Sequence, residues 1–308
     1  MLKAENIFLA FNTVILKKVD LQIDRGEVLG LVGKSGAGKS SLLKILSGNL
    51  QTNSGKVFFD HKELPPAQDL LIPGYKKIEL VNQDFKLDSY HTVEENIREA
   101  ILYLPNEFRE KRIKKMLRLF ELKHLANEKA HLISGGEQQR VAIARSVAKN
   151  PDFLLLDEPF GNLDTLLKNK LKQYIQEIRA EENTGILLVS HDAQDVLGMS
   201  DSICLLKNGV LSKKYGCEEI YYDLKNLAQS QLFGYVNKVV INGQEERFRP
   251  DEYEINNSGI PIQFIRSNFT GGYYENIFIS ENKERIVLNS TMRMDHVSNI
   301  NVSRKKFN

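Results

Sequence analysis

Apolar runs and alternating patterns predict several strands near the start of the chain. Residues 7–9 form one apolar run. Val19, Leu21 and Ile23 then recur at every second position, the spacing of a strand with one buried face. The next run, residues 28–32, is apolar without a polar interruption, which is typical of a strand buried on both faces.

Two later runs, residues 153–156 and 186–189, have the same character. Helical patterns lie around them at residues 40–46, 94–125 and 137–148. A further helix is indicated by apolar residues on one face: Leu167, Leu171, Tyr174, Ile175 and Ile178. Because buried strands that alternate with helices form a parallel sheet covered on both faces, we expect an α/β fold here.

After about residue 216 the helical pattern fades and short strands separated by turn signals take over. Four such strands are expected, at residues 236–241, 260–265, 273–279 and 285–288. The turn signals are Asn242-Gly243, Ser258-Gly259 and Gly271-Gly272. This pattern predicts a small antiparallel β domain over residues 216–308, following an α/β domain over residues 1–215.

Composition and charge narrow the class of protein. The 308 residues include 42 lysines and arginines and 40 aspartates and glutamates, a formal net charge of +2, which argues against nucleic acid as the main partner. Hydrophobic residues make up 42%, enough for a sizeable core. Two cysteines cannot form a disulfide framework, so a reducing cytoplasm is expected. No apolar run approaches the ~18–20 residues that cross a bilayer, so we expect a soluble protein.

A cluster of basic residues lies in the helical pattern near residue 110. Its members are Arg109, Lys111, Arg112, Lys114, Lys115 and Arg118. One interpretation is a patch that binds nucleic acid or a membrane surface. The other is a solvated helix face, since runs of charge keep many helices soluble.

A glycine-rich motif, G-x-x-x-x-G-K-S, lies between the strand at 28–32 and the helix at 40–46. Its glycines allow backbone N–H groups to approach phosphate oxygens closely, and the helix N-terminus adds partial positive charge. In this motif the lysine reaches the β- and γ-phosphates, and the serine hydroxyl binds Mg²⁺. The motif does not by itself distinguish kinases, GTPases and ATPases. The candidate nucleotide-binding residues are Gly33, Lys34, Ser35, Gly36, Ala37, Gly38, Lys39, Ser40 and Ser41.

Two carboxylates, Asp157 and Glu158, follow the apolar run at 153–156. In open α/β sheets this end of a strand faces the ligand crevice. Asp157 can hold Mg²⁺ there, directly or through water, and Glu158 can take a proton from an attacking water. Pro159 keeps a plainer interpretation open, in which the acidic pair opens a turn.

The stretch Ile133-Ser134-Gly135-Gly136-Glu137 resembles the signature of the ATP-binding cassette family, L-S-G-G-Q or L-S-G-G-E. Other motifs of that family follow in their proper order over roughly the first two-thirds of the chain. The matching residues are Gln83 at the Q-loop, Asp157 and Glu158 at the second nucleotide-binding motif, Asp164 in the D-loop, His191 at the switch histidine, and Phe11 where an adenine-stacking tyrosine is usual. Several ordered motifs are far more specific than any one of them.

The resemblance implies a P-loop ATPase cassette with a mixed sheet and a helical subdomain at about residues 86–135. It implies ATP and Mg²⁺ as cofactors, with Glu158, His191 and Gln83 as catalytic residues. The residues that it places at the metal are Ser40, Gln83 and Asp157.

The same resemblance implies that one chain holds only half of each site. In the family, the loop that corresponds to Ser134, Gly135 and Gly136 faces the γ-phosphate on the opposite subunit. Asp164 would help to order the seam between the two subunits. We therefore expect an ATP-dependent homodimer, or a dimer with a second cassette.

Three positions depart from the family pattern. Ile133 replaces the usual leucine, which changes packing. Phe11 can stack on a base but lacks a hydroxyl, so base preference is expected to be looser. Lys34 adds a cation at a variable position of the phosphate loop. None of these changes removes a catalytic group, so we expect an active ATPase.

The C-terminal part resembles the oligonucleotide-fold-like domain, called TOBE, of importer ATPases for iron, sulfate, polyamines and molybdate. The matching segments are residues 219–222, 233–237, 248–252 and 269–274. A β appendage that only dimerises is the alternative interpretation.

A single cassette without a membrane span resembles a separately encoded transporter ATPase. Its expected partners are integral membrane permeases at the cytoplasmic face of the inner membrane and an extracytoplasmic solute-binding protein, with no nucleic acid. The alternatives are a soluble cassette ATPase of translation or DNA repair, a nucleotide-gated regulatory module, and the ATPase of an exporter.

Overall fold

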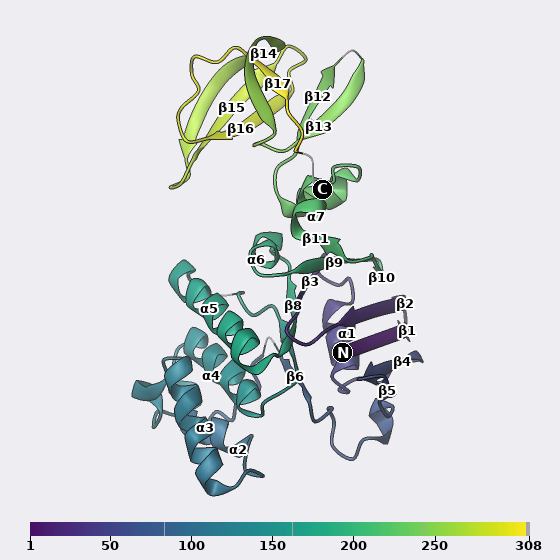
Figure 1. The fold of residues 1–308 in the computed structure, drawn as a ribbon, viewed down its shortest axis with the longest axis vertical. Coiled ribbons are helices and arrows are strands. Elements are labelled where there is room, and N and C mark those ends of the chain that lie inside the picture. The colour runs from purple at the N-terminus through teal and green to yellow at the C-terminus, as the bar shows by residue number, and fades with distance from the viewer. Residues whose placement is uncertain (83, 162, 242, 306–308) are drawn as a thin grey trace. The chain divides into compact units, whose positions relative to one another are not determined.

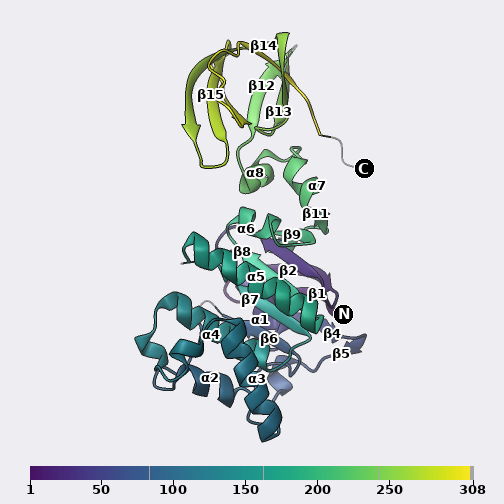
Figure 2. The same ribbon diagram turned by 60° about the vertical axis from the view of Figure 1, so that its left-hand side comes forward.

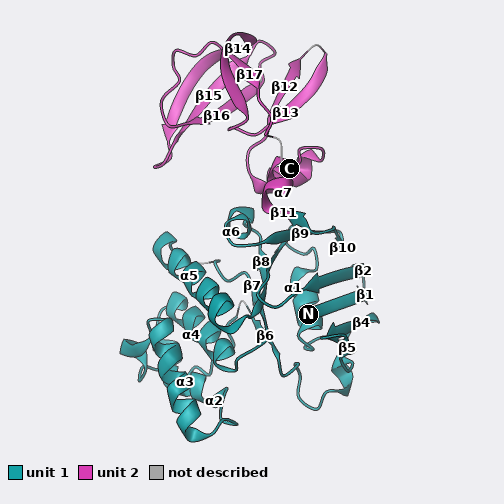
Figure 3. Ribbon diagram, viewed as in Figure 1, with its two compact units in different colours: residues 1–215 teal, residues 216–308 magenta. Residues whose placement is uncertain are grey.

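The chain folds into the helices and strands drawn in Figure 1, a computed structural model that describes residues 1–82, 84–161, 163–241 and 243–305. It divides into two compact units, Met1–Tyr215 and Gly216–Asn308 (Figure 3). Each unit has a hydrophobic core of its own. Among the described residues, none of the helices has the length and apolar character needed to span a bilayer.

The larger sheet of the first unit runs in the order β10-β9-β3-β8-β7-β6. Neighbours from β9 to β6 are parallel, and β10 is antiparallel to β9. As the apolar runs predicted, every residue of β3, β7 and β8 is buried. The strands are β3 (Val28–Val32), β6 (Ile78–Val81), β7 (Phe153–Asp157), β8 (Gly185–Ser190), β9 (Ser202–Lys207) and β10 (Val210–Leu211). The first residue of β11 (Tyr215–Gly216) is the last residue of the unit.

A smaller antiparallel sheet has the order β2-β1-β4-β5. Helix α1 (Lys39–Leu46) lies between the two sheets, because its Leu42 and Leu43 share one core with Leu16 of β2 and Leu155 of β7. The helix ends where Gly48, at φ 73°, donates to the carbonyl of Ile45. The strands of this sheet are β1 (Leu2–Ala10), β2 (Val14–Ile23), β4 (Ser54–Phe59) and β5 (Lys62–Glu63).

Three helices form a cluster beside the larger sheet (Figure 2). They are α2 (Val93–Glu99), α3 (Asn106–Leu119) and α4 (Gly135–Ala148). Two short 3₁₀ turns, Lys123–Leu125 and Ala130–Leu132, connect α3 to α4. Two further helices follow the strand ends of the sheet, α5 (Thr165–Glu182) after β7 and α6 (Ala193–Leu197) after β8. The first unit is therefore an α/β domain with a mixed sheet and helices, as the sequence predicted.

Three of the basic residues of α3, Lys111, Arg112 and Lys115, pair with carboxylates of the same unit. Arg112 forms an ion pair with Glu182 of α5 and donates to the carbonyls at the end of α4. The ammonium of Lys115 lies 2.8 Å from Glu181. Through these contacts the basic face of α3 holds α3, α4 and α5 together. They therefore favour a structural role for this face and not the binding of nucleic acid.

The second unit is an antiparallel β domain, as the sequence predicted. Its four-stranded sheet has the order β16-β15-β14-β17, and β12 and β13 form a separate hairpin. Phe248, Phe278, Leu288 and Ile300 lie in its core. Its elements are α7 (Cys217–Tyr222), α8 (Leu227–Ser230), β12 (Asn237–Ile241), β13 (Gln244–Phe248), β14 (Tyr253–Phe269), β15 (Tyr274–Ser280), β16 (Arg285–Ser290) and β17 (Asn299–Val302), with a 3₁₀ turn at Gln231–Phe233.

The turn predicted at Ser258-Gly259 is wrong, because β14 continues through both residues. At this point the pairing of β14 with β17 shifts register, and both Ile255 and Ile260 pair with Ile300. A Cβ on Gly259 would lie 2.2 Å from the Ile300 carbonyl oxygen. The glycine therefore serves a close backbone approach at a bulge and not a turn.

Arg249, whose side chain is fully buried, connects the start of the second unit to its strands. Its guanidinium donates to four backbone carbonyls, those of Tyr221, Ser230, Gly234 and Tyr235, at 2.7–3.2 Å. It also stacks on the Tyr221 ring, 4.2 Å from the centroid. One side chain thus satisfies backbone groups of the whole segment that precedes β12.

We expect Arg249→Met to lower the free energy of unfolding of the second unit by about 3 kcal/mol, because it leaves buried carbonyls unpaired. Urea denaturation followed by circular dichroism measures the change. Arg247→Met is the matched control, because Arg247 bonds Glu245 and the carbonyls of Leu224 and Lys225 from a half-buried position. It should cost less than about 1 kcal/mol. Equal losses in the two variants would contradict the role given to Arg249.

Candidate nucleotide site

The glycine-rich loop connects β3 to α1 in a conformation that only glycine adopts easily. Gly38, directly before α1, has φ 102°, and Gly36 has φ 77°. Gly33 is needed for space, since a Cβ there would lie 2.4 Å from the carbonyl oxygen of Leu206. The loop can therefore turn its backbone N–H groups toward one point, which is the geometry of a phosphate cradle.

The Lys39 side chain is held inside this loop. It is 7% exposed, and its ammonium donates to the carbonyls of Gly33 at 2.7 Å and Lys34 at 3.2 Å. A buried ammonium needs several acceptors to replace lost hydration. Phosphate oxygens arriving in the loop would give Lys39 stronger, charge-assisted partners.

Asp157, the last residue of β7, is 9% exposed, and its Oδ1 atom is buried without a hydrogen-bond partner. Burial raises the pKa of Asp157, a hydrogen bond with Ser40 opposes this, and the Glu158 charge raises the pKa further. A partnerless carboxylate oxygen beside a serine hydroxyl is the hard-oxygen donor set that Mg²⁺ prefers. The residues present therefore fit the ion.

Glu158 is the first residue after β7 and has a left-handed backbone, φ 55°. Its N–H donates to the carbonyl of Val189 at 3.0 Å. Its Oε2 accepts from the backbone N–H of His191 at 3.2 Å and lies 2.5 Å from the Nδ1 atom of the same residue. A non-glycine residue in this region carries strain of about 1 kcal/mol or more, which is characteristic of functional sites. The backbone and His191 together fix where the carboxylate points.

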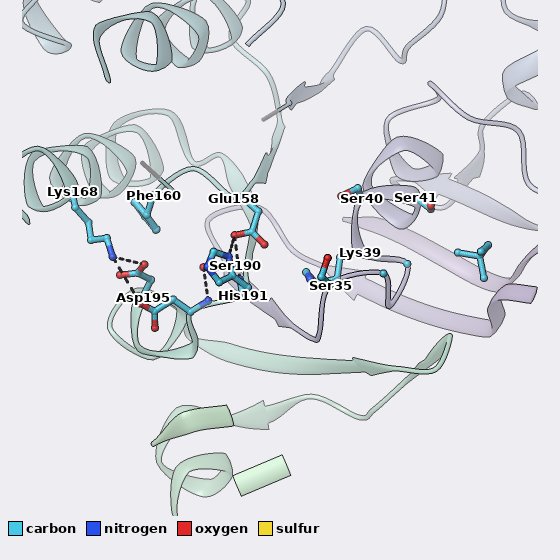
Figure 4. A pocket seen from close by; sticks show the side chains of 15 residues that line it. Ser35, Lys39, Ser40, Ser41, Glu158, Phe160, Lys168, Ser190, His191 and Asp195 are labelled. Carbon is cyan, nitrogen blue, oxygen red and sulfur yellow. Dashed lines mark hydrogen bonds and ion pairs between the residues drawn. The ribbon is translucent and has the colours of Figure 1, made fainter. Parts of the chain in front are cut away.

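These parts enclose one cavity of about 720 Å³. Figure 4 shows Glu158 and His191 on one side of it and Ser35 and Lys39 on the other. The lining residues are Ile15, Ser35, Gly36, Gly38, Lys39, Ser40, Ser41, Glu158, Phe160, Gly161, Lys168, Ser190, His191, Asp192 and Asp195. The cavity is large enough for a nucleotide.

Several residues of this wall were missed from the sequence. Ile15 lies on β2, and Phe160 follows Glu158. Lys168 lies one helical turn after Asp164, and Asp195 lies in the first turn of α6, four residues after His191. This spacing is the signal that could have indicated them. Phe11, expected to stack on adenine, is 66% exposed and does not line the cavity, whereas Ile15 does.

The signature residues lie elsewhere on the unit. Ser134 caps α4 and exchanges hydrogen bonds with Glu137. Ser134 and Gly135 are exposed, and neither they nor Gly136 line the cavity among the described residues. The start of α4 is thus an exposed helix N-terminus, the kind of position that favours anions, and it does not line the cavity described above.

Other predicted residues also stand outside the cavity wall. Asp164 caps α5, accepting from the N–H of Leu167 at 2.9 Å. Gly33, Lys34, Ala37 and Asp157 are not among the lining residues either, although the carbonyls of Gly33 and Lys34 accept from the Lys39 ammonium. Gln83, predicted for the Q-loop, lies outside the described residues, as does Asn162 of the D-loop.

The sequence profile of the family described as ABC transporter matches residues 16–161. The glucose import ATP-binding protein GlcV of Saccharolobus solfataricus is 30% identical over 263 residues, which cover 84% of this chain and 71% of that protein. The spermidine/putrescine import ATP-binding protein PotA of Clostridium novyi is 34% identical over 243 residues, which cover 78% and 69%. The chain belongs to the ABC transporter family.

Solved structures of ABC proteins support the same assignment. A dimeric, post-hydrolysis structure of the ATP-binding cassette MJ0796 with ADP and Pi is 30% identical, with a TM-score of 0.63, covering 70% of this chain and 99% of that one. An ATP-binding subunit of an ABC transporter is 26% identical, with a TM-score of 0.65, covering 72% and 92%. The chain is thus the ATP-binding subunit of an ABC transporter and an ATPase.

We expect Asp157→Asn to stabilise the nucleotide-free protein by on the order of 1 kcal/mol at pH 8, because it removes a buried charge with an unpaired oxygen. Since burial raises the pKa of Asp157, the wild-type penalty exists only above that pKa. The gain should therefore shrink as the pH falls toward it. Thermal unfolding without nucleotide at pH 8 and pH 5 measures the difference. Equal or lower stability of the variant at pH 8 would contradict this account.

Proposed function

We propose that this chain powers solute import by binding and hydrolysing ATP between two copies of itself, or between itself and a second cassette, beneath partner permeases. The observation that carries the hydrolytic part is the contact of Glu158 with His191 across one cavity from the phosphate loop. The import assignment is supported by the relatives GlcV and PotA, both described as import ATP-binding proteins.

Each residue near the cavity has a physical role in this proposal. When ATP binds, the Lys39 ammonium leaves the carbonyls of its own loop and bonds the β- and γ-phosphates. Glu158 accepts a proton from the attacking water, and His191 orients that carboxylate and contacts the γ-phosphate. Ser40 and Asp157 would hold Mg²⁺, which neutralises charge on the phosphates. For Gln83, contact with the metal and with the attacking water stays a prediction.

The second cassette completes the site. Ser134 and Gly135 are exposed at the start of α4, and neither they nor Gly136 line the cavity of the phosphate loop in the described part of the chain. We infer that this terminus closes on the nucleotide held by the other chain, with Asp164 near the seam. The cassette MJ0796, which is similar to this chain, was solved as a dimer.

The partners are inferred from the import ATP-binding proteins that this chain is similar to. A subunit of that kind supplies ATP hydrolysis, and we infer that integral membrane permeases supply the transport path. We place the chain at the cytoplasmic face of the inner membrane, with a solute-binding protein as a further partner on the other side. No nucleic acid is expected, since several basic residues of α3 pair within the unit.

The alternatives drawn from the sequence have less support. The relatives named above are import subunits, and neither is a factor of translation, a DNA repair protein or an exporter subunit. The antiparallel second unit is consistent with a TOBE-like domain. Because of this similarity to a TOBE-like domain, we assign the second unit a regulatory or dimerising role.

We expect Glu158→Gln to lower kcat for ATP hydrolysis at least about 100-fold, because glutamine cannot accept the proton from water. Binding of a fluorescent ATP analogue should remain within about threefold, whereas Lys39→Ala should lose both binding and turnover. Glu177→Gln is the matched control, since Glu177 bonds Gln173 on the outer part of α5. Hydrolysis by Glu158→Gln at the wild-type rate would refute the role of Glu158.

A further inference from the structure

An ion cluster of Lys168, Lys172 and Asp195 lies beside the catalytic pair and has no part in the roles above. The Asp192 carboxylate lies at its edge, 4.0 Å from the Lys168 ammonium. The cluster joins the Asp195 carboxylate of α6 to two lysines of α5. The Lys168 ammonium lies 2.7 Å from one carboxylate oxygen, and the Lys172 ammonium lies 3.1 Å from the other. Figure 4 shows Lys168 and Asp195 reaching toward each other at the edge of the cavity. We call this group the α5–α6 clamp.

The clamp is well placed to act as a rigid link. Asp195 is 4% exposed, so its charge depends on the two lysines for compensation. Lys168 and Lys172 lie one helical turn apart and therefore on the same face of α5. The Lys172 ammonium also lies over the ring of Phe160, 5.5 Å from its centroid, two residues beyond Glu158.

Helix α6 is fixed from its other side by close packing on β3. Val196 is fully buried, and a Cβ on Gly30 would lie 2.1 Å from its Cγ1 atom. The helix has only five residues, so its own hydrogen bonds hold it weakly. Its position therefore depends on Val196 against β3 and on Asp195 against α5.

We propose that the α5–α6 clamp is a positioning device for hydrolysis. Lys168 lies one helical turn after Asp164, the N-cap of α5, and Asp195 lies in the first turn of α6, four residues after His191. The clamp therefore joins the two segments that carry Asp164 and His191. It holds the His191 imidazole against the Glu158 carboxylate and fixes the D-loop relative to both. The inference rests on the proposed hydrolytic roles of Glu158 and His191.

Breaking the clamp moves a catalytic group without removing one. A displacement of about 1 Å at a reacting group can cost a large factor in rate, while contacts to the phosphates remain. The clamp therefore affects kcat and not the affinity for ATP. Because Lys172 still pairs with Asp195 when Lys168 is changed, the loss should be partial.

The test compares Lys168→Met, Lys168→Arg and Asp195→Asn. We expect Lys168→Met to lower kcat about tenfold and Asp195→Asn, which breaks both pairs, to lower it further, in each case with KM for ATP within twofold. Lys168→Arg should keep at least half of the wild-type kcat. The matched control is Lys170→Met on the same helix, where Lys170 pairs with Glu121 at 2.6 Å away from the cavity. Its kcat should equal that of the wild type. The double variant Lys168→Met/Asp195→Asn should lose less than the product of the single losses.

Three results would overturn the clamp. One is a wild-type kcat in both Lys168→Met and Asp195→Asn. Another is an equal loss in Lys170→Met. The third is a kcat loss explained by a lower fraction of folded protein, as thermal melting in the assay buffer would show. Glu158→Gln is assayed in parallel: if it is inactive while the clamp variants are normal, only the clamp is refuted, and if it is fully active, the proposed function fails.

Discussion

The register of three parallel strands brings the chemistry of this protein together. Val32 of β3 pairs with Ser190 of β8, and Asp157 of β7 pairs with Val189 of the same strand. The residues that follow each strand therefore emerge at one level of one edge. The phosphate loop, Glu158 and His191 lie close together there because the strands that precede them end at the same level of the sheet. A shift of one residue in either of the two pairings would turn buried side chains toward the wrong face and separate these groups.

The nucleotide-free site carries unfavourable features that a ligand would relieve. Asp157 has a buried oxygen without a partner, Glu158 has a left-handed backbone, and Lys39 bonds carbonyls of its own loop. Such features persist because the surrounding sheet fixes them. A triphosphate would supply anions for Lys39, and its metal would supply a partner for Asp157. These features lower the stability of the nucleotide-free protein, but they hold the polar groups in the arrangement that the substrate needs.

The parts of the site that depend on backbone geometry were predictable from the sequence. The phosphate loop needs glycines at fixed positions, and β3, β7 and β8 needed unbroken apolar runs. The wall contributed by side chains was not predictable, because Ile15, Lys168 and Asp195 reach the cavity only through tertiary packing. The same limit explains Ser258-Gly259, where the partner strand and not the dipeptide decides the conformation. Phe11 was predicted from family position alone, and its side chain lies away from the cavity wall.

The central claim is that each chain holds half of two shared sites, since the signature terminus at Ser134 is exposed away from its own cavity. Multi-angle light scattering of the Glu158→Gln variant tests this most directly, because ATP should persist on it. With MgATP the account predicts a molar mass twice that of the 35.2 kDa chain, returning to the single-chain mass when ATP is removed. A single-chain mass at saturating, demonstrably bound MgATP would contradict the account.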